Sequence, residues 1–201
     1  VWTTYERLCA SAAGTTMSAT ELPGAEIPVA YEGCERESCA RAAADLLRAA
    51  RAHSLTLAVA ESLTGGQVSS SLVEIPGASR VLVGAVVAYA TRIKAQVLGV
   101  DAAHLERTGP VDRDVALQMA RGVRRLLGTD LGLATTGVAG PGPADAHPAG
   151  TVHIAVVAPW GEAHRELHLG GGRSHVRYDA VLSVLGLAVE FLHEAGRGET
   201  D

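Results

Sequence analysis

Short apolar runs alternate along this chain with stretches of helical period, and this alternation constrains the fold most. Apolar runs at 55–61, 81–90 and 131–136 are too short for buried helices, and we expect each to be a buried strand. Two more strands, joined by a tight turn at Trp160-Gly161, are expected over 151–169. Helices are expected at 38–54, 66–73, 91–100, 113–127 and 174–195. The order predicts the α/β class: a three-layer α/β/α sandwich with a mixed, mainly parallel sheet.

The sequence predicts where the folded domain begins and which residues cap two of its helices. Residues 1–35 mix small, polar and turn-forming residues without a helical or strand period, which predicts an irregular N-terminal tail before a domain at 36–197. Ser38 is expected to cap the first helix and Asp112 the helix at 113–127, because both residue types accept hydrogen bonds from free N–H groups at a helix start.

Charge and cysteine usage limit the partners. The formal net charge is -5, and the chain has neither a basic stripe nor interleaved aromatic residues, which argues against a nucleic-acid surface. No apolar run has membrane-spanning length, so no membrane partner is expected. The three cysteines follow no zinc pattern and build no disulfide framework. We therefore expect a cytoplasmic protein that binds a small soluble ligand and needs no metal or cofactor.

Lys94 is the single lysine, since the other sixteen of the seventeen basic residues are arginine. A buried lysine can lose its proton and act as a base, whereas arginine cannot. Ser62 follows an expected strand and precedes Gly65 and Gly66, a placement that suits a nucleophile beside inward-turned N–H groups. The two together predict a Ser-Lys hydrolase pair. Two plainer interpretations stay open: Ser62 or Thr64 caps the next helix, and Lys94 is an ordinary solvated side chain.

The remaining candidates lie in loops beyond the expected strand ends, where ligands of open α/β sheets bind. Tyr89 precedes Lys94 by five residues and is expected over the same pocket, unless it is a core ring with a satisfied hydroxyl. Thr136 and Gly137 end a strand at a loop rich in glycine and proline. Arg173 follows three glycines at a helix start, where N–H groups and guanidinium together favour a phosphate; the alternative is a flexible turn with a solvated arginine.

Six motifs in a fixed order resemble the CinA C-terminal domain family, the nicotinamide-nucleotide amidases, over residues 38–195. They are AESLTGG, PGAS, VVAYATRIKAQVLGV, TTGVAGP, GTVHIAV and GGR. The resemblance implies a compact α/β/α fold that associates as a homo-oligomer. It also implies metal-free hydrolysis of nicotinamide mononucleotide, a small-molecule nucleotide substrate, to nicotinate mononucleotide and ammonia in pyridine-nucleotide salvage.

The motifs also imply roles for single residues. Ser62 is the expected nucleophile, Lys94 its base, and Tyr89 the group that tunes proton transfer between them. Substrate binding is expected from Thr136 and Gly137, which orient the substrate, and from Arg173, which grips the 5′-phosphate. The N–H groups near Thr64, Gly65 and Gly66 are expected to hold the oxyanion.

Five positions depart from the commonest family pattern: Leu63, Ala90, Thr91, Pro110 and Gly172. These departures leave two alternatives open. One is a catalytically inactive nucleotide-binding domain of the same fold with a regulatory role, and the other is an amidohydrolase that acts on another amide. Many relatives carry a larger domain before this one, and since 35 irregular residues are too few for it, a stand-alone version is expected.

Overall fold

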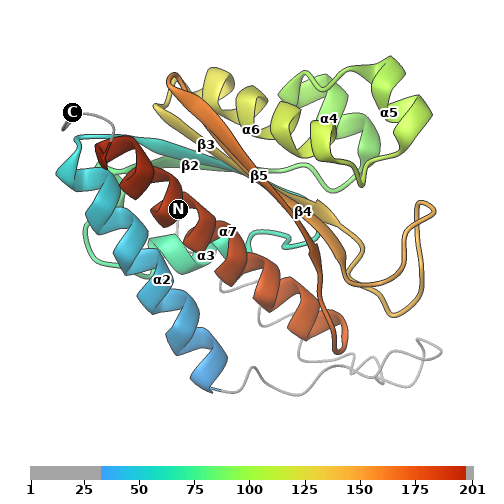
Figure 1. The fold of residues 1–201 in the computed structure, drawn as a ribbon, viewed down its shortest axis with the longest axis horizontal. Helices are drawn as coiled ribbons and strands as arrows, with labels where there is room; N and C mark the ends of the chain where they lie inside the picture. Colours follow the sequence, from blue (N-terminus) through green and yellow to red (C-terminus); the bar gives the residue numbers. More distant parts are fainter. Residues whose placement is uncertain (1–32, 198–201) are drawn as a thin grey trace, which may run out of the picture. The chain divides into compact units, whose positions relative to one another are not determined.

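A computed structural model describes residues 33–197, so most of the expected N-terminal tail lies outside the described residues. The chain divides into two units, 1–30 and 31–201, and the description below concerns the second. Its elements are α2 (Gly33–Ala52), β1 (Leu57–Glu61), α3 (Gln67–Val73), η2 (Ala78–Arg80), β2 (Leu82–Val87), α4 (Thr91–Leu98), α5 (Ala102–Thr108), α6 (Arg113–Leu127), β3 (Leu131–Gly137), β4 (Thr151–Ala158), β5 (Gly161–His168) and α7 (Arg173–Arg197) (Figure 1).

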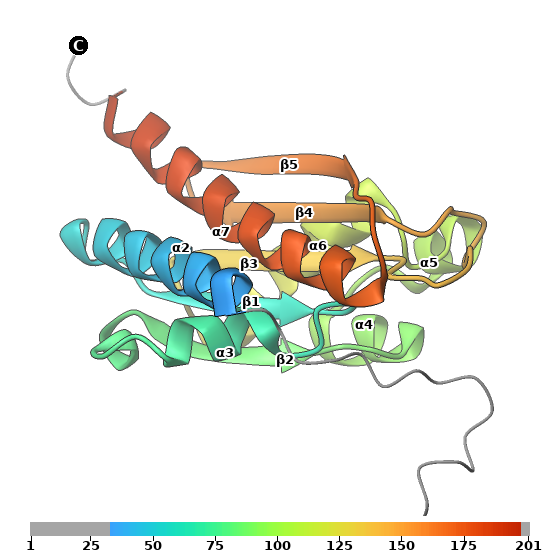
Figure 2. The ribbon, with the colours of Figure 1, turned by 90° about the horizontal axis from the view of Figure 1, so that it is seen from below.

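The five strands form one sheet in the order β2-β1-β3-β4-β5, which can be followed in Figure 2. Strands β2, β1 and β3 pair in parallel, whereas β4 is antiparallel to both β3 and β5. Four strands therefore run in one direction and β4 alone runs against them. This arrangement confirms the predicted mixed sheet and the hairpin at its end.

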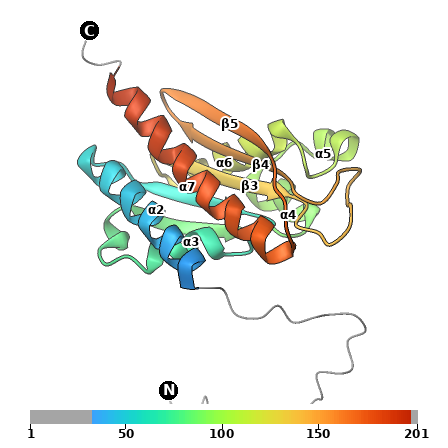
Figure 3. The ribbon, with the colours of Figure 1, turned by 60° about the horizontal axis from the view of Figure 1, so that its bottom comes forward.

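Helices cover both faces of the sheet and enclose an aliphatic core on each side. Helices α2, α3 and α7 lie over one face, with α7 crossing the strands diagonally (Figure 3), and α4, α5 and α6 lie over the other. Strand β1 contributes to both cores: Leu57 and Val59 face the first layer, and Ala58 and Ala60 face the second. A strand buried on both faces reads as a continuous apolar run, as this one does. The three-layer sandwich is confirmed.

The helix starts agree with the sequence in one case and differ in another. Asp112 caps α6, because its side chain accepts hydrogen bonds from the backbone N–H groups of Asp114 (2.8 Å) and Val115 (3.2 Å). Ser38 is not a cap: α2 begins at Gly33, and Ser38 lies inside the helix. The prediction was wrong because the residues before Ser38 continue the helix, in which Glu37 and Arg41 pair at the favourable i, i+4 spacing.

Strand β2 and helix α5 also differ from expectation. Strand β2 was expected to be buried, but it lies at the edge of the sheet, and alternate residues such as Val83 and Val87 are about half exposed, at 53% and 47%. Only β1 flanks this strand, and the apolar run alone does not indicate that it has a single neighbour. Helix α5 was not predicted; Asp101 caps it by accepting from the N–H of His104. Within 33–197, no helix combines the length and the apolar character needed to cross a membrane.

Candidate functional site

A cavity of about 300 Å³ opens where the carboxyl ends of β1, β2 and β3 meet the loop that follows β3. This is the edge of the sheet at which the sequence placed the site. The cavity is lined by Ser62, Leu63, Tyr89, Thr91, Lys94, Pro110, Val111, residues 136–145 and Arg173. Six of the nine predicted site residues are among these: Ser62, Tyr89, Lys94, Thr136, Gly137 and Arg173.

The floor of the cavity holds a serine and a lysine in contact. The Nζ atom of Lys94, from α4, lies 2.9 Å from the Oγ atom of Ser62, which follows β1. The same Nζ donates a hydrogen bond to the backbone carbonyl of Ala88 at 2.8 Å. Lys94 is 1% exposed and Ser62 8% exposed. The interpretation of Lys94 as a solvated lysine is therefore wrong.

Burial changes the proton affinity of this amine. Desolvation lowers the pKa of Lys94 from 10.5 to about 8, against an opposing contribution from the charge of Asp145. A useful fraction of the amine is therefore neutral near pH 8, and it can then accept a proton while it still donates to Ala88. A side chain with this property beside a hydroxyl suits general-base catalysis.

Close packing of α4 on α6 sets the position of Lys94. A Cβ atom on Gly122 of α6 would lie 2.0 Å from the backbone oxygen of Leu98, the last residue of α4. Only glycine at this position lets the two helices approach so closely. Lys94 lies one turn before Leu98, so this contact fixes how far its side chain reaches into the cavity.

The turn that carries Ser62 is held from below by Glu61, a fully buried carboxylate that the sequence analysis did not single out. Its Oε2 accepts from the N–H groups of Gly66 (2.9 Å) and Val68 (3.1 Å), and its Oε1 from the N–H (2.9 Å) and hydroxyl (2.8 Å) of Ser69. These four bonds tie the start of α3 to the end of β1. The only signal in the sequence was an acidic residue at the end of an apolar run.

The same bonds correct the expected oxyanion site. The N–H of Gly66 is used by Glu61, and the N–H of Gly65 donates to the backbone oxygen of Ser62 at 3.1 Å. Thr64 is fully buried, and its hydroxyl bonds to that of Thr135 at 2.8 Å. None of Thr64, Gly65 and Gly66 lines the cavity. Gly65 and Gly66 instead allow the chain to turn between β1 and α3, because their φ values of 59° and 97° favour glycine.

Arg177 of α7 is a second residue that the sequence analysis missed. Its Nε donates to the backbone oxygen of Leu63 (2.9 Å) and its Nη2 to that of Thr64 (2.8 Å). A residue more than a hundred positions away thus clamps the peptide between Leu63 and Thr64 and the peptide between Thr64 and Gly65. Arg177 lies four residues after Arg173, so one face of α7 directs both guanidiniums towards the site.

The rim of the cavity is built by Tyr89 and Arg173. Arg173 donates to the backbone oxygen of Gly140 (2.8 Å) and to the hydroxyl of Tyr89 (3.2 Å). Tyr89 is 63% exposed, so the core-ring alternative is wrong. Among the described residues its hydroxyl bonds to Arg173 rather than to Lys94 or Ser62, which does not support its predicted part in proton transfer. Thr136 lies deeper, 1% exposed, and donates to the backbone oxygen of Pro110 at 2.7 Å.

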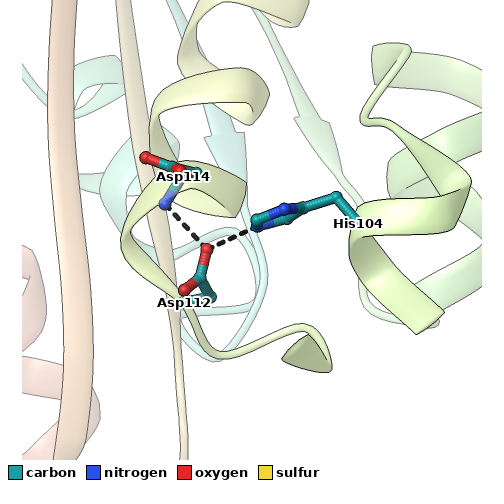
Figure 4. A group of neighbouring side chains, drawn as sticks. All are labelled: His104, Asp112 and Asp114. Carbon is teal, nitrogen blue, oxygen red and sulfur yellow. Dashed lines mark hydrogen bonds and ion pairs between the residues drawn. The ribbon is translucent and has the colours of Figure 1, made fainter. Parts of the chain in front are cut away.

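One group of side chains in the described part of the chain is close enough to be weighed as metal ligands. It consists of His104, Asp112 and Asp114, whose ligand atoms lie within 4.8 Å of one another (Figure 4). The Oδ1 of Asp112 already accepts from two N–H groups of α6 and contacts Nε2 of His104 at 2.8 Å, while Nδ1 of His104 contacts Arg107 at 3.3 Å. The group therefore serves as a helix cap, and none of its three residues lines the cavity.

Comparison with known proteins gives consistent matches. The family model described as the CinA C-terminal domain matches residues 39–192. A CinA-like protein of Synechococcus is 43% identical over 189 residues, covering 90% of this chain and 45% of its own length. A CinA-like protein of Frankia casuarinae is 48% identical over 139 residues, covering 69% and 32%. The chain thus spans from about a third to just under half of the length of these curated relatives.

Two solved structures have the same fold. The CinA superfamily protein of Klebsiella pneumoniae superposes with a TM-score of 0.75 at 28% identity, covering 78% of this chain and 98% of that one. The competence/damage inducible protein of Agrobacterium tumefaciens gives 0.71 at 34% identity, with 83% and 99% covered. Both superpositions cover about four fifths of this chain.

Proposed function

The chain belongs to the CinA C-terminal domain family, and from this membership and the geometry of the cavity we propose that it is a nicotinamide-nucleotide amidase. The proposed reaction is hydrolysis of the carboxamide of nicotinamide mononucleotide to a carboxylate and ammonia. One observation carries the proposal: the buried amine of Lys94 lies 2.9 Å from the hydroxyl of Ser62 at the floor of the cavity.

In the first half of the reaction, the Oγ of Ser62 attacks the carboxamide carbon and neutral Lys94 takes the hydroxyl proton. The tetrahedral intermediate then breaks its C–N bond, and Lys94 returns that proton to the departing nitrogen, which leaves as ammonia. In the second half, Lys94 takes a proton from water, whose oxygen attacks the resulting ester. Collapse releases the carboxylic acid, and the proton on Lys94 restores the hydroxyl of Ser62.

The oxyanion of both intermediates needs a donor other than the N–H groups of Gly65 and Gly66. We assign this role to the backbone N–H of Leu63, the residue after the nucleophile, as in other hydrolases with a serine at a strand-to-helix turn. Leu63 lines the cavity, and its N–H donates to no acceptor within the part of the chain that the structure describes. Arg177 holds the next peptide, between Leu63 and Thr64, through the oxygen of Leu63.

Arg173 supports a phosphate-bearing substrate. Its guanidinium stands at the rim and at the first residue of α7, where the helix dipole also favours an anion. Two bonds, to Gly140 and Tyr89, orient it even though Gly172 replaces an acidic residue common in the family. In this proposal Tyr89 positions Arg173, and Thr136 borders the ring of the substrate. A cavity of about 300 Å³ suits one nicotinamide nucleotide.

The test is ammonia release from nicotinamide mononucleotide by the wild type and by Ser62→Ala. We expect the variant to lose at least about a thousandfold in kcat, because a missing nucleophile leaves only binding and electrostatic effects. Ser70→Ala is the matched control, since Ser70 lies on α3 outside the cavity and should leave the rate unchanged. Binding without turnover by the wild type would favour the catalytically inactive alternative. Turnover of other amides in preference to this one would favour the second.

Equal rates for the wild type and Ser62→Ala would refute the mechanism. Lys94→Met tests the base separately, because methionine fills a similar volume without an ionisable group. We expect it to be inactive and still folded. Lys94→Arg is a weaker test, since a larger charged group would have to enter a site that is 1% exposed.

A further inference from the structure

Asp145 is the one carboxylate among the described residues that line the cavity, and the proposed mechanism gives it no role. It lies in the loop between β3 and β4, which forms the wall of the cavity facing Lys94 and Ser62. The charge of Asp145 acts on the amine of Lys94 across the cavity. A negative group in the wall of the same cavity acts on whatever charge the substrate carries there.

The backbone holds Asp145 in place at the tip of a small hairpin. Ala144 and His147 exchange both backbone hydrogen bonds, at 3.0 and 2.9 Å. Between them Asp145 and Ala146 have φ values of 50° and 64°, the left-handed pair of a type I′ turn, a conformation in which aspartate is favoured. The tip rests near Gly109, where an added Cβ would lie 3.8 Å from that of Asp145. The turn therefore fixes the backbone position of Asp145, whose side chain is exposed at the cavity.

The charges around the cavity are separated in space. Arg173 supplies a positive charge at the rim, beside Tyr89 and the start of α7. Asp145 supplies a negative charge on the loop wall, and Lys94 is positive or neutral according to pH. A ligand that matches this pattern has an anionic end for Arg173 and a cationic part near its amide.

We propose that Asp145 is the specificity-determining residue of the cavity, whose carboxylate selects amides carried on a cationic ring, such as an N-substituted pyridinium. The inference rests on the proposed function and deepens it by naming the substrate class. It distinguishes two nucleotides of equal size and equal phosphate charge, the oxidised and the reduced forms of nicotinamide mononucleotide. Only the oxidised form carries a positive ring.

Binding to catalytically inert protein tests this selection. With Ser62→Ala, calorimetry should give tighter binding of the oxidised than of the reduced nucleotide. Adding Asp145→Asn should reduce that preference by about fivefold or more, the factor expected for one charge pair in a partly hydrated site, mainly through weaker binding of the oxidised form. Asp45→Asn, on exposed α2 outside the cavity, is the control and should leave the preference unchanged. An unchanged preference in Asp145→Asn would overturn the inference.

A second measurement needs no substrate. Because Lys94 is the single lysine, protein labelled with carbon-13 lysine gives one side-chain signal whose titration reports this amine directly. Asp145→Asn removes the charge that raises the pKa of Lys94, so the midpoint should move to lower pH. An unmoved midpoint would show that Asp145 does not act on the cavity.

The two arms separate the possible failures. Ammonia release with no ring-charge preference removes this inference and leaves the proposed function standing. Absence of both binding and turnover with either nucleotide removes the proposed function and the substrate class with it. Loss of the preference for the oxidised nucleotide in Asp145→Asn, together with a shifted titration midpoint of Lys94, supports both the proposed function and the role of Asp145.

Discussion

The buried amine of Lys94 makes the stability of the protein depend on pH in a defined window. In the folded chain its pKa is about 8, against 10.5 for an ordinary lysine. Between these two pH values the unfolded chain binds a proton that the folded chain has released. The free energy of unfolding should therefore rise as the pH is raised from 8 to 10.5, and this gain is lost again as the pH falls from 10.5 to 8.

The size of the effect follows from the two pKa values. Each unit corresponds to about 1.4 kcal/mol, so the full difference is worth roughly 3 kcal/mol. Water screens this contribution little, because the side chain of Lys94 is only 1% exposed. The sign is opposite to that of a lysine in a salt bridge, whose raised pKa makes the protein lose stability above pH 10.5.

Lys94→Met isolates this contribution, because it removes the titrating group and leaves all others. Urea unfolding followed by circular dichroism, at intervals of half a pH unit from 7 to 10.5, gives the unfolding free energy of both proteins. The wild type minus the variant should be flat below pH 7 and should rise by roughly 3 kcal/mol by pH 10.5. A difference that stays flat across the whole range would mean that Lys94 is not desolvated, and the reasoning for a neutral base would fail with it.

Three further predictions concern the groups that support the site. Glu61→Gln should lower the unfolding free energy by about 2 kcal/mol or more, since an amide cannot accept the four hydrogen bonds of the carboxylate; urea titration measures it. Gly122→Ala should cost about 1–3 kcal/mol and most of the activity, because the new methyl group displaces Leu98 and α4; thermal melts and ammonia release check both, and a wild-type melt would contradict it. Arg177→Met should reduce kcat about tenfold with a smaller effect on KM, with part of the loss restored in Arg177→Lys; equal kcat in all three proteins would remove the clamp.

The fold was predictable where periodicity and burial agree. The run that became β1 is apolar throughout because both faces of the strand are covered, and the cap at Asp112 is a local signal that the structure confirms. Edge position is not a local property, so β2 could not be told from a central strand. At Ser38 a residue that often caps helices was outweighed by the helix-forming residues around it.

The candidate site was predictable in its ionisable centre and less so in its supports. A lone lysine among arginines and a serine at a strand end pointed to the pair that the fold brings into contact. The expected donors at Gly65 and Gly66 failed because Glu61 and the turn itself use them, which only the three-dimensional arrangement reveals. Arg177 and Asp145 reach the site from distant segments, and no spacing along the chain connects them with Ser62.

The earlier and the later half of the described chain contribute different groups to the cavity. Ser62 and Lys94 both belong to the stretch from β1 to α4, whereas Thr136, Asp145 and Arg173 come from β3 onwards. Divergence in the later half can therefore change which molecule is held while the earlier half, where the bond would be broken, stays intact. A domain of this kind can therefore acquire new substrates while it keeps the residues that would break the bond.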